Sequence, residues 1–335
     1  MGMNPFFMAK YPFSREARDF VEEHFDLGIA ELTEPEHLEA VERGFQRVHQ
    51  SITHKEVLFE AQNMIHYDVE VVSFPIAVML VALINDDLLR NMFATAEAKR
   101  CAQLMAQNGK EVLDVARELD LSFRTATEAG AEGLLAIRLA DYLSCSPHRW
   151  GESWRLVSRT LNKGEVYVTD HELARIIEER IKKAVLDRTR ANVEGVRLPP
   201  SITKKRDELV DVWKEYKAKI QPEARLDQRD MPPCMTRLVQ RMTEGENLSH
   251  VERRTAVSYL STIGKTEEEI MSLLRYSPDF DERVARYQLE HLMGVRGRGK
   301  KYLPPSCAKM RTYGLCFPDK WCRGIRHPLR YRRAS

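Results

Sequence analysis

Four cysteines near the end of the 335-residue chain are its clearest candidates for chemistry. They are Cys234, Cys307, Cys316 and Cys322, and the last three lie within the tail PPSCAKMRTYGLCFPDKWCRGIRHPLRYRR. Thiolate sulfur is a ligand of zinc and of iron–sulfur clusters. Pro and Gly residues near these cysteines suit a loop that wraps an ion, and Cys234 can close the ligand shell from 72 intervening residues upstream. The pattern predicts a metal or cluster site.

The residues alone leave the identity of the bound group open. In number, four thiolates suit a tetrahedral zinc ion or a four-iron, four-sulfur cluster equally well. Structural zinc usually has roughly two to four residues between paired cysteines. The gaps after Cys307 and Cys316 are eight and five residues, which favours the cluster. We expect Arg311, Lys320 and Arg323 to lower the pKa of the thiols. The third alternative is a set of unliganded cysteines in a core.

The tail around the cysteines is strongly basic. Residues 296–335 contain twelve Lys and Arg and one acid, Asp319. Residues 226–335 hold 21 basic and 13 acidic side chains, against 31 and 37 in the preceding part, although the net charge is only +2. This polarity predicts that the carboxy-terminal part meets nucleic acid or nucleotides and that the amino-terminal part meets protein.

The length of 335 residues and the composition, 43% hydrophobic and 30% charged, predict a soluble protein of two domains, and we expect it in the cytoplasm. No signal-peptide pattern opens the sequence. The most apolar stretch, Val71–Ile84, is shorter than the roughly 20 residues that cross a bilayer and contains Pro75, so it predicts a buried core helix and no membrane association. Clustered cysteines in a reducing compartment bind metals more often than they form disulfides. Cys101 and Cys145 are expected to be buried without a function.

Helical patterns dominate the first part of the chain. Thr33 and Glu36 form a capping pattern that opens a helix from about Glu34 to His49. The amphipathic segment 85–109 predicts a second long helix, which Gly109 ends. Two more helices are expected between Asp114 and Leu143.

The segment from Trp154 to Asp170 departs from this helical pattern. It alternates apolar and polar residues on both sides of the turn at 162–164, which predicts a β-hairpin. Thr169 and Glu172 then form a capping box that opens a helix to about Arg190. The apolar residues of the hairpin are a candidate partner-facing surface: Val166, Tyr167 and Val168.

The predicted domain boundary is the polar stretch Gln221–Pro233, which follows a charged helix from Lys204 to Lys219. We therefore expect an amino-terminal domain at 1–220 and a carboxy-terminal domain at 226–335. The overall class is mostly α: a helical first domain with a small α/β hairpin element, and a helical, loop-rich second domain.

Capping boxes also mark the helices of the second domain. Ser249 with Glu252 opens one helix and Thr266 with Glu269 the next, and Gly264 is placed to end the first. The predicted helices are His250–Thr262, Glu267–Tyr276 and Asp281–Leu292.

The helix His250–Thr262 is the first candidate for binding phosphates. Its first turn offers backbone N–H groups, and His250, Arg253 and Arg254 stand beside them. Arg253 is the strongest candidate because a guanidinium can donate to two phosphate oxygens at once. The alternative is a solvated helix face on which Arg253 pairs with Glu252 and other local acids.

A basic loop and three aromatic residues give weaker signals. The loop is either a solvated charge run or a patch that follows a nucleic-acid backbone. Its members are Arg296, Arg298, Lys300 and Lys301. The aromatic side chains either stack on bases or shield a metal site from water. They are Tyr302, Tyr313 and Trp321.

The order of short motifs in the last hundred residues resembles the large, non-catalytic subunit of archaeal and eukaryotic-type DNA primase. The motifs are PPCM, LSHVERRTAVSYLSTIGKTEEEI, SPDF, YQLEHL, PPSC, YGLC, WC and HPLRY. Earlier segments resemble the amino-terminal domain of archaeal members: FPIAVMLVALI, AEAKRCAQLM and KGEVYVTDHELARIIEERI.

The resemblance implies a four-iron, four-sulfur cluster bound by the four late cysteines, which would make the second domain an iron–sulfur domain. Arg253 aligns with the arginine of the family's primer-binding helix. Ser249 and Ser261 stand where eukaryotic relatives tend to have basic residues, so the full set of contacts is not reproduced.

The same resemblance implies a regulatory subunit in a heterodimeric primase, without catalytic residues of its own. The carboxy-terminal domain would bind the single-stranded DNA template and the triphosphate-bearing 5′ end of the RNA primer, or the RNA/DNA duplex that they form. The amino-terminal domain would dock the small catalytic subunit.

Two rival functions come from other classes. An iron–sulfur redox enzyme or electron carrier would need a second cofactor site, and no Rossmann glycine pattern is present. A zinc- or cluster-stabilised nucleic-acid-binding protein without a primase partner is the other alternative.

Overall fold

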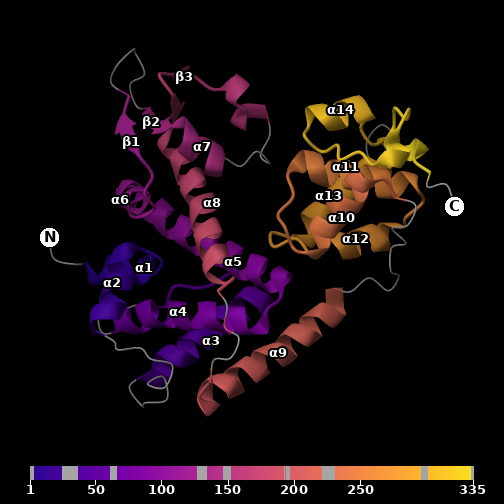
Figure 1. The fold of residues 1–335 in the computed structure, drawn as a ribbon. Coiled ribbons are helices and arrows are strands. Elements are labelled where there is room, and N and C mark those ends of the chain that lie inside the picture. The colour runs from indigo at the N-terminus through magenta and orange to yellow at the C-terminus, as the bar shows by residue number, and fades with distance from the viewer. Residues whose placement is uncertain are drawn as a thin grey trace. The chain divides into compact units, whose positions relative to one another are not determined.

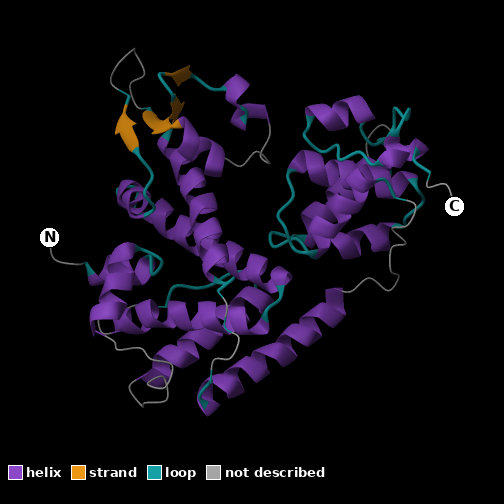
Figure 2. Ribbon diagram, viewed as in Figure 1, coloured by secondary structure: helices purple, strands orange, loops and turns teal. Residues whose placement is uncertain are grey.

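The computed structural model describes residues 4–24, 37–60, 66–126, 134–145, 152–191, 193, 197–220, 231–295 and 301–332. The chain forms two compact units, one of Met1–Pro147 with Glu152–Tyr216 and one that contains Lys217–Ser335. Helices predominate in both, and a small antiparallel sheet belongs to the first (Figure 1 and Figure 2). The predicted mostly helical class is confirmed. The predicted boundary stretch lies largely outside the described residues.

The first unit is built around long helices. Its helices are α1 (Pro5–Lys10), α2 (Arg15–His24), α3 (Leu38–Thr53), α4 (Tyr67–Ile84), α5 (Asp87–Gln107), α6 (Glu111–Glu118), α7 (Leu139–Cys145), α8 (Asp170–Arg188) and α9 (Pro200–Ile220), with the division between units falling inside α9. Helix α4 packs on α3, and α5 packs on α8. Helix α3 corresponds to the helix predicted from Glu34, although Thr33 and Glu36 lie outside the described residues. Cys101 and Cys145 are buried, as predicted.

Helix α4 contains the predicted core segment but begins earlier, at Tyr67. Among the described residues it is the one helix long and apolar enough to cross a membrane, and more than half of it is buried inside the protein. Its buried Glu70 pairs with Arg43 and Arg47 of α3 at 2.7 Å each. Paired charges of this kind identify α4 as a core helix of the first unit.

The ion pairs on α4 belong to a larger buried network. Arg47, fully buried, also pairs with Glu97 of α5 at 2.9 Å, and Arg100 pairs with the same carboxylate at 3.1 Å. Burial alone would raise the pKa of Glu97, but Arg47 and Arg100 outweigh it and hold the pKa below its ordinary value. Three helices are therefore joined by charges that depend on one another.

The sheet of the first unit has the strand order β1-β2-β4-β3, with antiparallel pairs throughout. Its strands are β1 (Phe123–Thr125), β2 (Leu135–Arg138), β3 (Leu161–Asn162) and β4 (Glu165–Val168). The predicted hairpin is confirmed as β3 and β4. Lys163 and Gly164 both have positive φ, 47° and 81°, which is the backbone conformation of a tight two-residue hairpin turn.

Two expectations for this region are met only in part, and a third is wrong. Helices α6 and α7 overlap the range Asp114–Leu143 in which two helices were predicted, but Leu135 and Ile137 between them lie in β2, because Leu135 pairs with Val168 far along the chain. Only the end of the first hairpin strand predicted from Trp154 forms, as β3, and the residues before it form two 3₁₀ turns, η4 (Glu152–Trp154) and η5 (Leu156–Ser158). The proposed partner surface is buried, because β4 contacts α8 and Tyr167 packs against Ala126 and Ala136. Its residues are Val166, Tyr167 and Val168, at most 7% exposed.

The second unit is a small helical core with a loop-rich end. Its elements are α10 (Pro233–Thr243), α11 (His250–Thr262), α12 (Glu267–Leu274), α13 (Glu282–Met293), α14 (Cys307–Thr312), η6 (Lys320–Cys322) and η7 (Pro328–Arg330). The predicted capping boxes of α8, α11 and α12 are all present. Gly264, with φ +93°, follows the end of α11 as predicted.

Candidate metal and nucleic-acid sites

The structure brings the four predicted cysteines to one cavity of the second unit. Cys234 lies in the first turn of α10, Cys307 begins α14 and Cys322 ends η6, while Cys316 lies in the loop between α14 and η6. Their cavity is also lined by Met310, Phe317 and Ile325. Segments far apart in the sequence thus present four thiols to a common space.

Polar contacts hold the loops that carry these cysteines. Asp319 Oδ1 accepts hydrogen bonds from the backbone N–H groups of Trp321 at 2.9 Å and Cys322 at 3.0 Å. Its other oxygen accepts from the hydroxyl of Tyr331 at 2.7 Å. The backbone N–H of Cys307 donates to the carbonyl of Arg326 at 3.0 Å. Hydrogen bonds between residues of the tail therefore hold the loops around the cysteines in place.

The acidity of the thiols differs from the sequence-based expectation. Burial raises the pKa of Cys234 to about 12, with a further increase from the neighbouring Cys316. Burial also raises the pKa of Cys307, where Arg311 opposes it without reversing it. Arg311 thus acts on the pKa of Cys307 in the predicted direction, but burial outweighs it and the net shift is upward. A bound cation would supply the charge that favours the thiolates.

The donor set is the main indication of what the cavity can hold. Within the described ranges, no three His, Cys, Asp or Glu side chains form a group that could hold a metal ion by spacing alone. A single zinc ion would place its four sulfurs about 3.8 Å apart, given bonds of about 2.3 Å. All four thiols nonetheless line one cavity, and thiolates alone ligate common iron–sulfur clusters. The cavity therefore gathers four sulfur donors but does not hold them at the spacing of a bound zinc ion.

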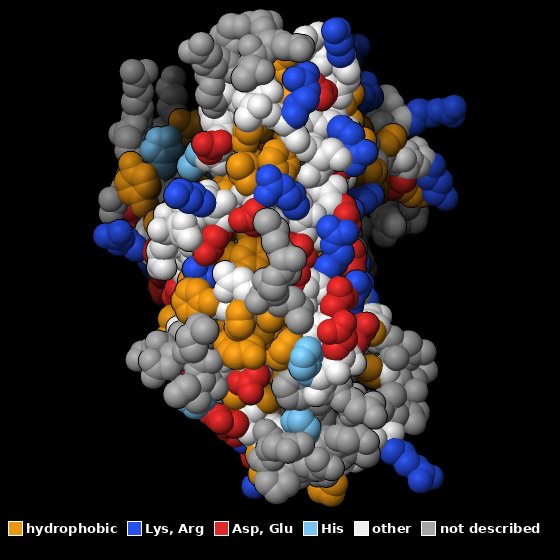
Figure 3. All heavy atoms as spheres, turned by 90° about the vertical axis from the view of Figure 1, so that its left-hand side faces the viewer, with side chains coloured by type: hydrophobic (Ala, Val, Ile, Leu, Met, Phe, Trp, Pro, Cys, Tyr) orange, Lys and Arg blue, Asp and Glu red, His pale blue; other side chains and the backbone are white. Residues whose placement is uncertain are grey.

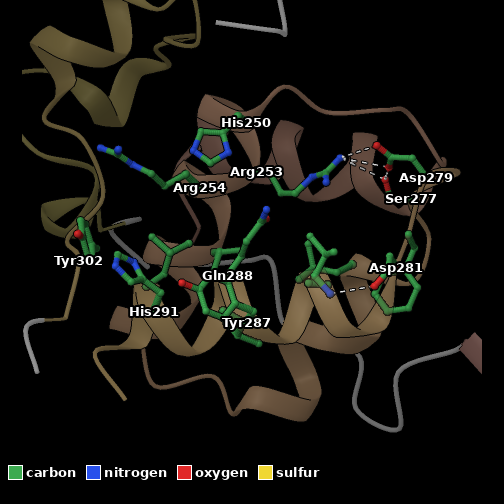
Figure 4. Close-up of a pocket in the computed structure, with 17 residues that line it drawn as sticks. His250, Arg253, Arg254, Ser277, Asp279, Asp281, Tyr287, Gln288, His291 and Tyr302 are labelled. Atoms are coloured by element: carbon green, nitrogen blue, oxygen red, sulfur yellow. Dashed lines mark hydrogen bonds and ion pairs between the residues drawn. The ribbon is translucent and has the colours of Figure 1, made fainter. Parts of the chain in front are cut away.

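A second cavity of the same unit, about 490 Å³ in volume, contains the predicted phosphate-binding residues (Figure 4). Helices α11 and α13 supply most of its wall, the segment between them supplies a further part, and Tyr302 lines it from beyond the end of α13. Its polar lining includes His250, Arg253, Arg254, Ser277, Asp279, Gln288 and His291. The volume is within the range of small-ligand sites.

Arg253 is anchored at one end of this cavity. Its Nη2 lies 3.3 Å from Asp279 Oδ1, 3.4 Å from Ser277 Oγ and 3.1 Å from Asn247 Oδ1. The predicted alternative partner, Glu252, pairs instead with Arg241. Glu252 turns inward because it closes the capping box of α11. Asp279 was not among the site residues predicted from the sequence, although it belongs to the SPDF motif.

Arg254 points in the opposite direction (Figure 4). Its guanidinium carbon lies 6.0 Å from the centroid of the Tyr302 ring. Adjacent helix residues do not face each other, so Arg253 and Arg254 reach different ends of the cavity. His250 lies at the exposed start of α11. All three predicted residues line one cavity, but they do not converge on one point.

The N-terminus of α11 offers fewer free donors than its sequence suggested. The backbone N–H of Glu252 donates to Ser249 Oγ at 3.1 Å, and the N–H of Ser249 donates to Glu252 Oε2 at 2.8 Å. A buried carboxylate already stands at this helix end. Binding of phosphate here therefore depends mainly on side chains.

The basic loop and the aromatic residues are only partly described. Arg296, Arg298 and Lys300 lie outside the described residues, whereas Lys301 Nζ donates to the carbonyl of Ser261 at 2.7 Å. Tyr313 packs against the core of the second unit. Lys320 lies over the ring of Trp321 at 4.9 Å. Tyr302 alone of the three aromatic residues lines the larger cavity.

Each of the two units matches a model of a known protein family. Residues 9–194 match the family model of the amino-terminal domain of the eukaryotic and archaeal DNA primase large subunit. Residues 224–326 match the model of the carboxy-terminal domain of the same protein. The chain belongs to the DNA primase large-subunit family. This family is part of the DNA replication machinery.

Curated members of the primase large-subunit family are similar along almost the whole chain. DNA primase large subunit PriL of Methanococcoides burtonii is 31% identical, over 97% of this chain and 90% of its own length. The protein of the same name from Methanocella arvoryzae is 31% identical over 98% and 88%. That of Halobacterium salinarum is 32% identical over 96% and 91%.

Proposed function

We propose that this primase large subunit acts as the regulatory partner of a small catalytic subunit and holds the template and the 5′ end of the starting RNA primer. The observation that carries the proposal is the cavity between α11 and α13, which contains Arg253 and Arg254 in a chain of this family. Phosphate oxygens are recognised by guanidinium groups, and a triphosphate end offers several of them.

Arg253 is the proposed contact to the 5′-phosphates. Its contacts to Asp279 and Ser277 are 3.3 to 3.5 Å long, at the weak end of hydrogen bonding. A phosphate oxygen can form shorter, charge-assisted bonds with the same group. His250 stands at the exposed rim of the cavity, where it can contact the same phosphates or the template.

The four cysteines are the proposed ligands of a four-iron, four-sulfur cluster. Support comes from their shared cavity and from the wide spacing of Cys307, Cys316 and Cys322 in the sequence. The role proposed for the cluster is structural, because the loops there have little regular backbone bonding and four metal–sulfur bonds would join α10 to the tail. A zinc ion on the same thiols is the alternative.

The first unit is the proposed docking site of the catalytic subunit. Figure 3 shows the side of the molecule on which α1 and α2 lie, where apolar side chains are exposed in patches between interspersed basic and acidic ones. A mixed surface with apolar patches suits a protein partner better than a nucleic-acid backbone. The heterodimer is proposed to work in the cytoplasm.

Primer synthesis by the reconstituted heterodimer tests the proposal. Arg253→Ala should slow initiation from nucleotides by about 10- to 100-fold, because hydrogen bonds to charged groups contribute about 1.5–3 kcal/mol. Extension of a supplied primer with a 5′-hydroxyl end should change little. Arg283→Ala, an exposed residue of α13 that does not line the cavity, is the matched control. Equal loss in both assays would contradict capture of 5′-phosphates.

Metal analysis after anaerobic purification tests the cluster separately. Four iron and four sulfide per chain, with brown colour, are expected. A colourless protein that carries one zinc ion would contradict the cluster without affecting the role of Arg253.

A further inference from the structure

Residues 326–331 contact both parts of the tail that carry Cys307 and Cys322. At one end of this segment, the backbone carbonyl of Arg326 accepts a hydrogen bond from the N–H of Cys307 at 3.0 Å. We propose that the segment is a clasp that sets the positions of Cys307 and Cys322, with His327 as its central positioning residue. The inference rests on the proposed cluster, because these cysteines are two of its four proposed ligands.

His327 has a hydrogen-bonding partner at each ring nitrogen. The backbone N–H of Leu329 donates to Nδ1 at 3.3 Å, and Nε2 lies 3.1 Å from the carbonyl oxygen of Pro304. An amide N–H can only donate and a carbonyl oxygen can only accept, so Nδ1 carries no proton and Nε2 carries one. The two contacts therefore specify one neutral tautomer of the ring and use both of its nitrogens.

The contact with Pro304 reaches the residues that lead into Cys307. Pro304 is buried, and only two residues, the first of them Pro305, separate it from Cys307. Proline fixes its own φ, so this short stretch has little freedom to absorb a shift of Pro304. The bond from Cys307 to the carbonyl of Arg326, directly before His327, joins the same two segments a second time. Both bonds together fix the position of Cys307 relative to the clasp.

The other end of the clasp holds the loop of Cys322. Tyr331 is only 2% exposed, and its hydroxyl donates to Asp319 Oδ2 at 2.7 Å. Asp319 Oδ1 in turn accepts from the backbone N–H of Cys322 at 3.0 Å. The turn η7 keeps its shape by a bond from the N–H of Tyr331 to the carbonyl of Pro328 at 3.1 Å. One short segment thus joins two cysteine-bearing parts of the tail through bonds that the protein makes by itself.

A clasp of this kind affects how firmly a bound group is held. Ligands that are already in place lose less conformational freedom when they bind, so the group is held more tightly. Loosening the clasp should therefore speed the loss of iron from the proposed cluster.

Two substitutions of His327 separate its two contacts. The side-chain oxygen of Asn stands close to the position of Nδ1, so His327→Asn can still accept from Leu329 but does not reach Pro304. The amide nitrogen of Gln stands close to the position of Nε2, so His327→Gln can still donate to Pro304. If the contact with Pro304 positions Cys307, the Gln variant should resemble the wild type and the Asn variant should not.

Amide hydrogen exchange in the anaerobically purified full chain measures the clasp directly. The peptide that contains Cys307 should exchange about 2- to 10-fold faster in His327→Asn and at least as fast in His327→Ala, the range for loss of one neutral hydrogen bond. His327→Gln should exchange as the wild type does. Arg330→Ala, which alters an exposed side chain of the same segment, is the matched control.

Iron release to a chelator from the same preparations gives a second measurement. His327→Ala and His327→Asn should release iron about 2- to 10-fold faster than the wild type. His327→Gln and Arg330→Ala should release it at the wild-type rate.

The outcomes separate the clasp from the proposed cluster. A wild-type chain without iron would contradict the cluster, and the exchange rates near Cys307 would still decide whether the clasp exists. Equal exchange in the wild type and His327→Ala, or equal acceleration by the Asn and Gln variants, would overturn the role of His327 whichever metal is found.

Discussion

Arg253 is the residue on which the proposed recognition depends. Its Nη2 shares several long contacts, of which those to Asp279 are 3.3 and 3.5 Å. Asp279 therefore plays two opposing parts: it orients the guanidinium, and it places a negative charge where a phosphate would bind. The distances favour competition as the larger effect, because long hydrogen bonds are weak whereas charge repulsion extends further.

Replacing Asp279 tests this balance. Asp279→Asn keeps the size and hydrogen-bonding capacity of the side chain but removes its charge, so we expect inorganic triphosphate to bind about 3- to 10-fold more tightly in calorimetry at low salt. Folding stability should change by no more than about 1 kcal/mol, because the Arg253–Asp279 pair is partly exposed. Weaker binding by Asp279→Asn would show that orientation of Arg253 outweighs competition.

The sequence singled out Arg253, which lines the cavity, but did not indicate its partner. Glu252 is its neighbour in the chain and was the natural candidate, yet backbone direction at the helix start turns Glu252 inward. Asp279 reaches Arg253 only because α12 and the following segment fold back beside α11. Such a contact depends on tertiary packing, which no local pattern encodes.

At the scale of elements, the start of α11 combines capping with an ion pair. Burial alone would raise the pKa of Glu252, but Arg241 and the backbone N–H of Ser249 outweigh it and hold the pKa below its ordinary value. A carboxyl whose pKa is lowered on folding stabilises the protein above its unfolded-state pKa. That stabilisation is lost as the pH falls through the lowered folded-state pKa.

Glu252→Gln should therefore lower the free energy of unfolding by about 1–3 kcal/mol at pH 7. The difference from the wild type should shrink as the pH falls from about 5 to about 3, where the wild-type carboxyl takes up its proton. Urea denaturation followed by circular dichroism at several pH values measures this. Glu268→Gln, whose side chain is 68% exposed, is the control and should change little. A difference that stays constant with pH would contradict the assigned ionisation.

The loop that carries Cys322 depends on Asp319 in a similar way. Asp319→Ala removes acceptors for two backbone N–H groups and for the Tyr331 hydroxyl, so it should cost about 1–3 kcal/mol of stability. It should also speed the loss of iron from the proposed cluster to a chelator. Asp319→Asn retains one acceptor and should have a smaller effect. Unchanged iron release in Asp319→Ala would show that the cysteines alone hold the loop.

Elements bounded by local signals were predicted well, and elements defined by distant partners were not. The helices α11 and α12 begin directly after their N-cap residues, Ser249 and Thr266, because each capping box is complete within four residues. Strand β2, in contrast, has the short apolar sequence LAIR, which fits a helix or a strand. The segment becomes a strand because Leu135 pairs with Val168 of β4, which lies beyond the hairpin turn and far along the chain.

At the scale of the whole molecule, the two units have different sources of stability. The first has the buried network of Arg47, Glu70 and Glu97 inside a helical core. The second has a smaller core and, as proposed, a cluster bound by the four cysteines that line one cavity. The sequence located the cysteines but not the network, because Arg and Glu are usually exposed and their burial is not visible in a helical pattern.

Calorimetric unfolding should separate these two sources. Arg47→Met leaves two buried carboxylates short of a partner and should destabilise the first unit by about 3–5 kcal/mol. Removal of the proposed cluster by a chelator should instead lower the unfolding temperature of the second unit. Lys214→Met alters an exposed pair and is the control. If Arg47→Met and metal removal shifted the same single transition equally, the two units would not be energetically separate.

The central claim is that the cavity between α11 and α13 recognises the phosphorylated 5′ end of a primer. Its most direct test is equilibrium binding of this chain to an RNA–DNA duplex that carries either a 5′-triphosphate or a 5′-hydroxyl on the RNA strand. The wild type should prefer the triphosphate end by at least about tenfold, and Arg253→Ala should lose most of that preference. Equal binding of the two duplexes by the wild type would contradict the claim.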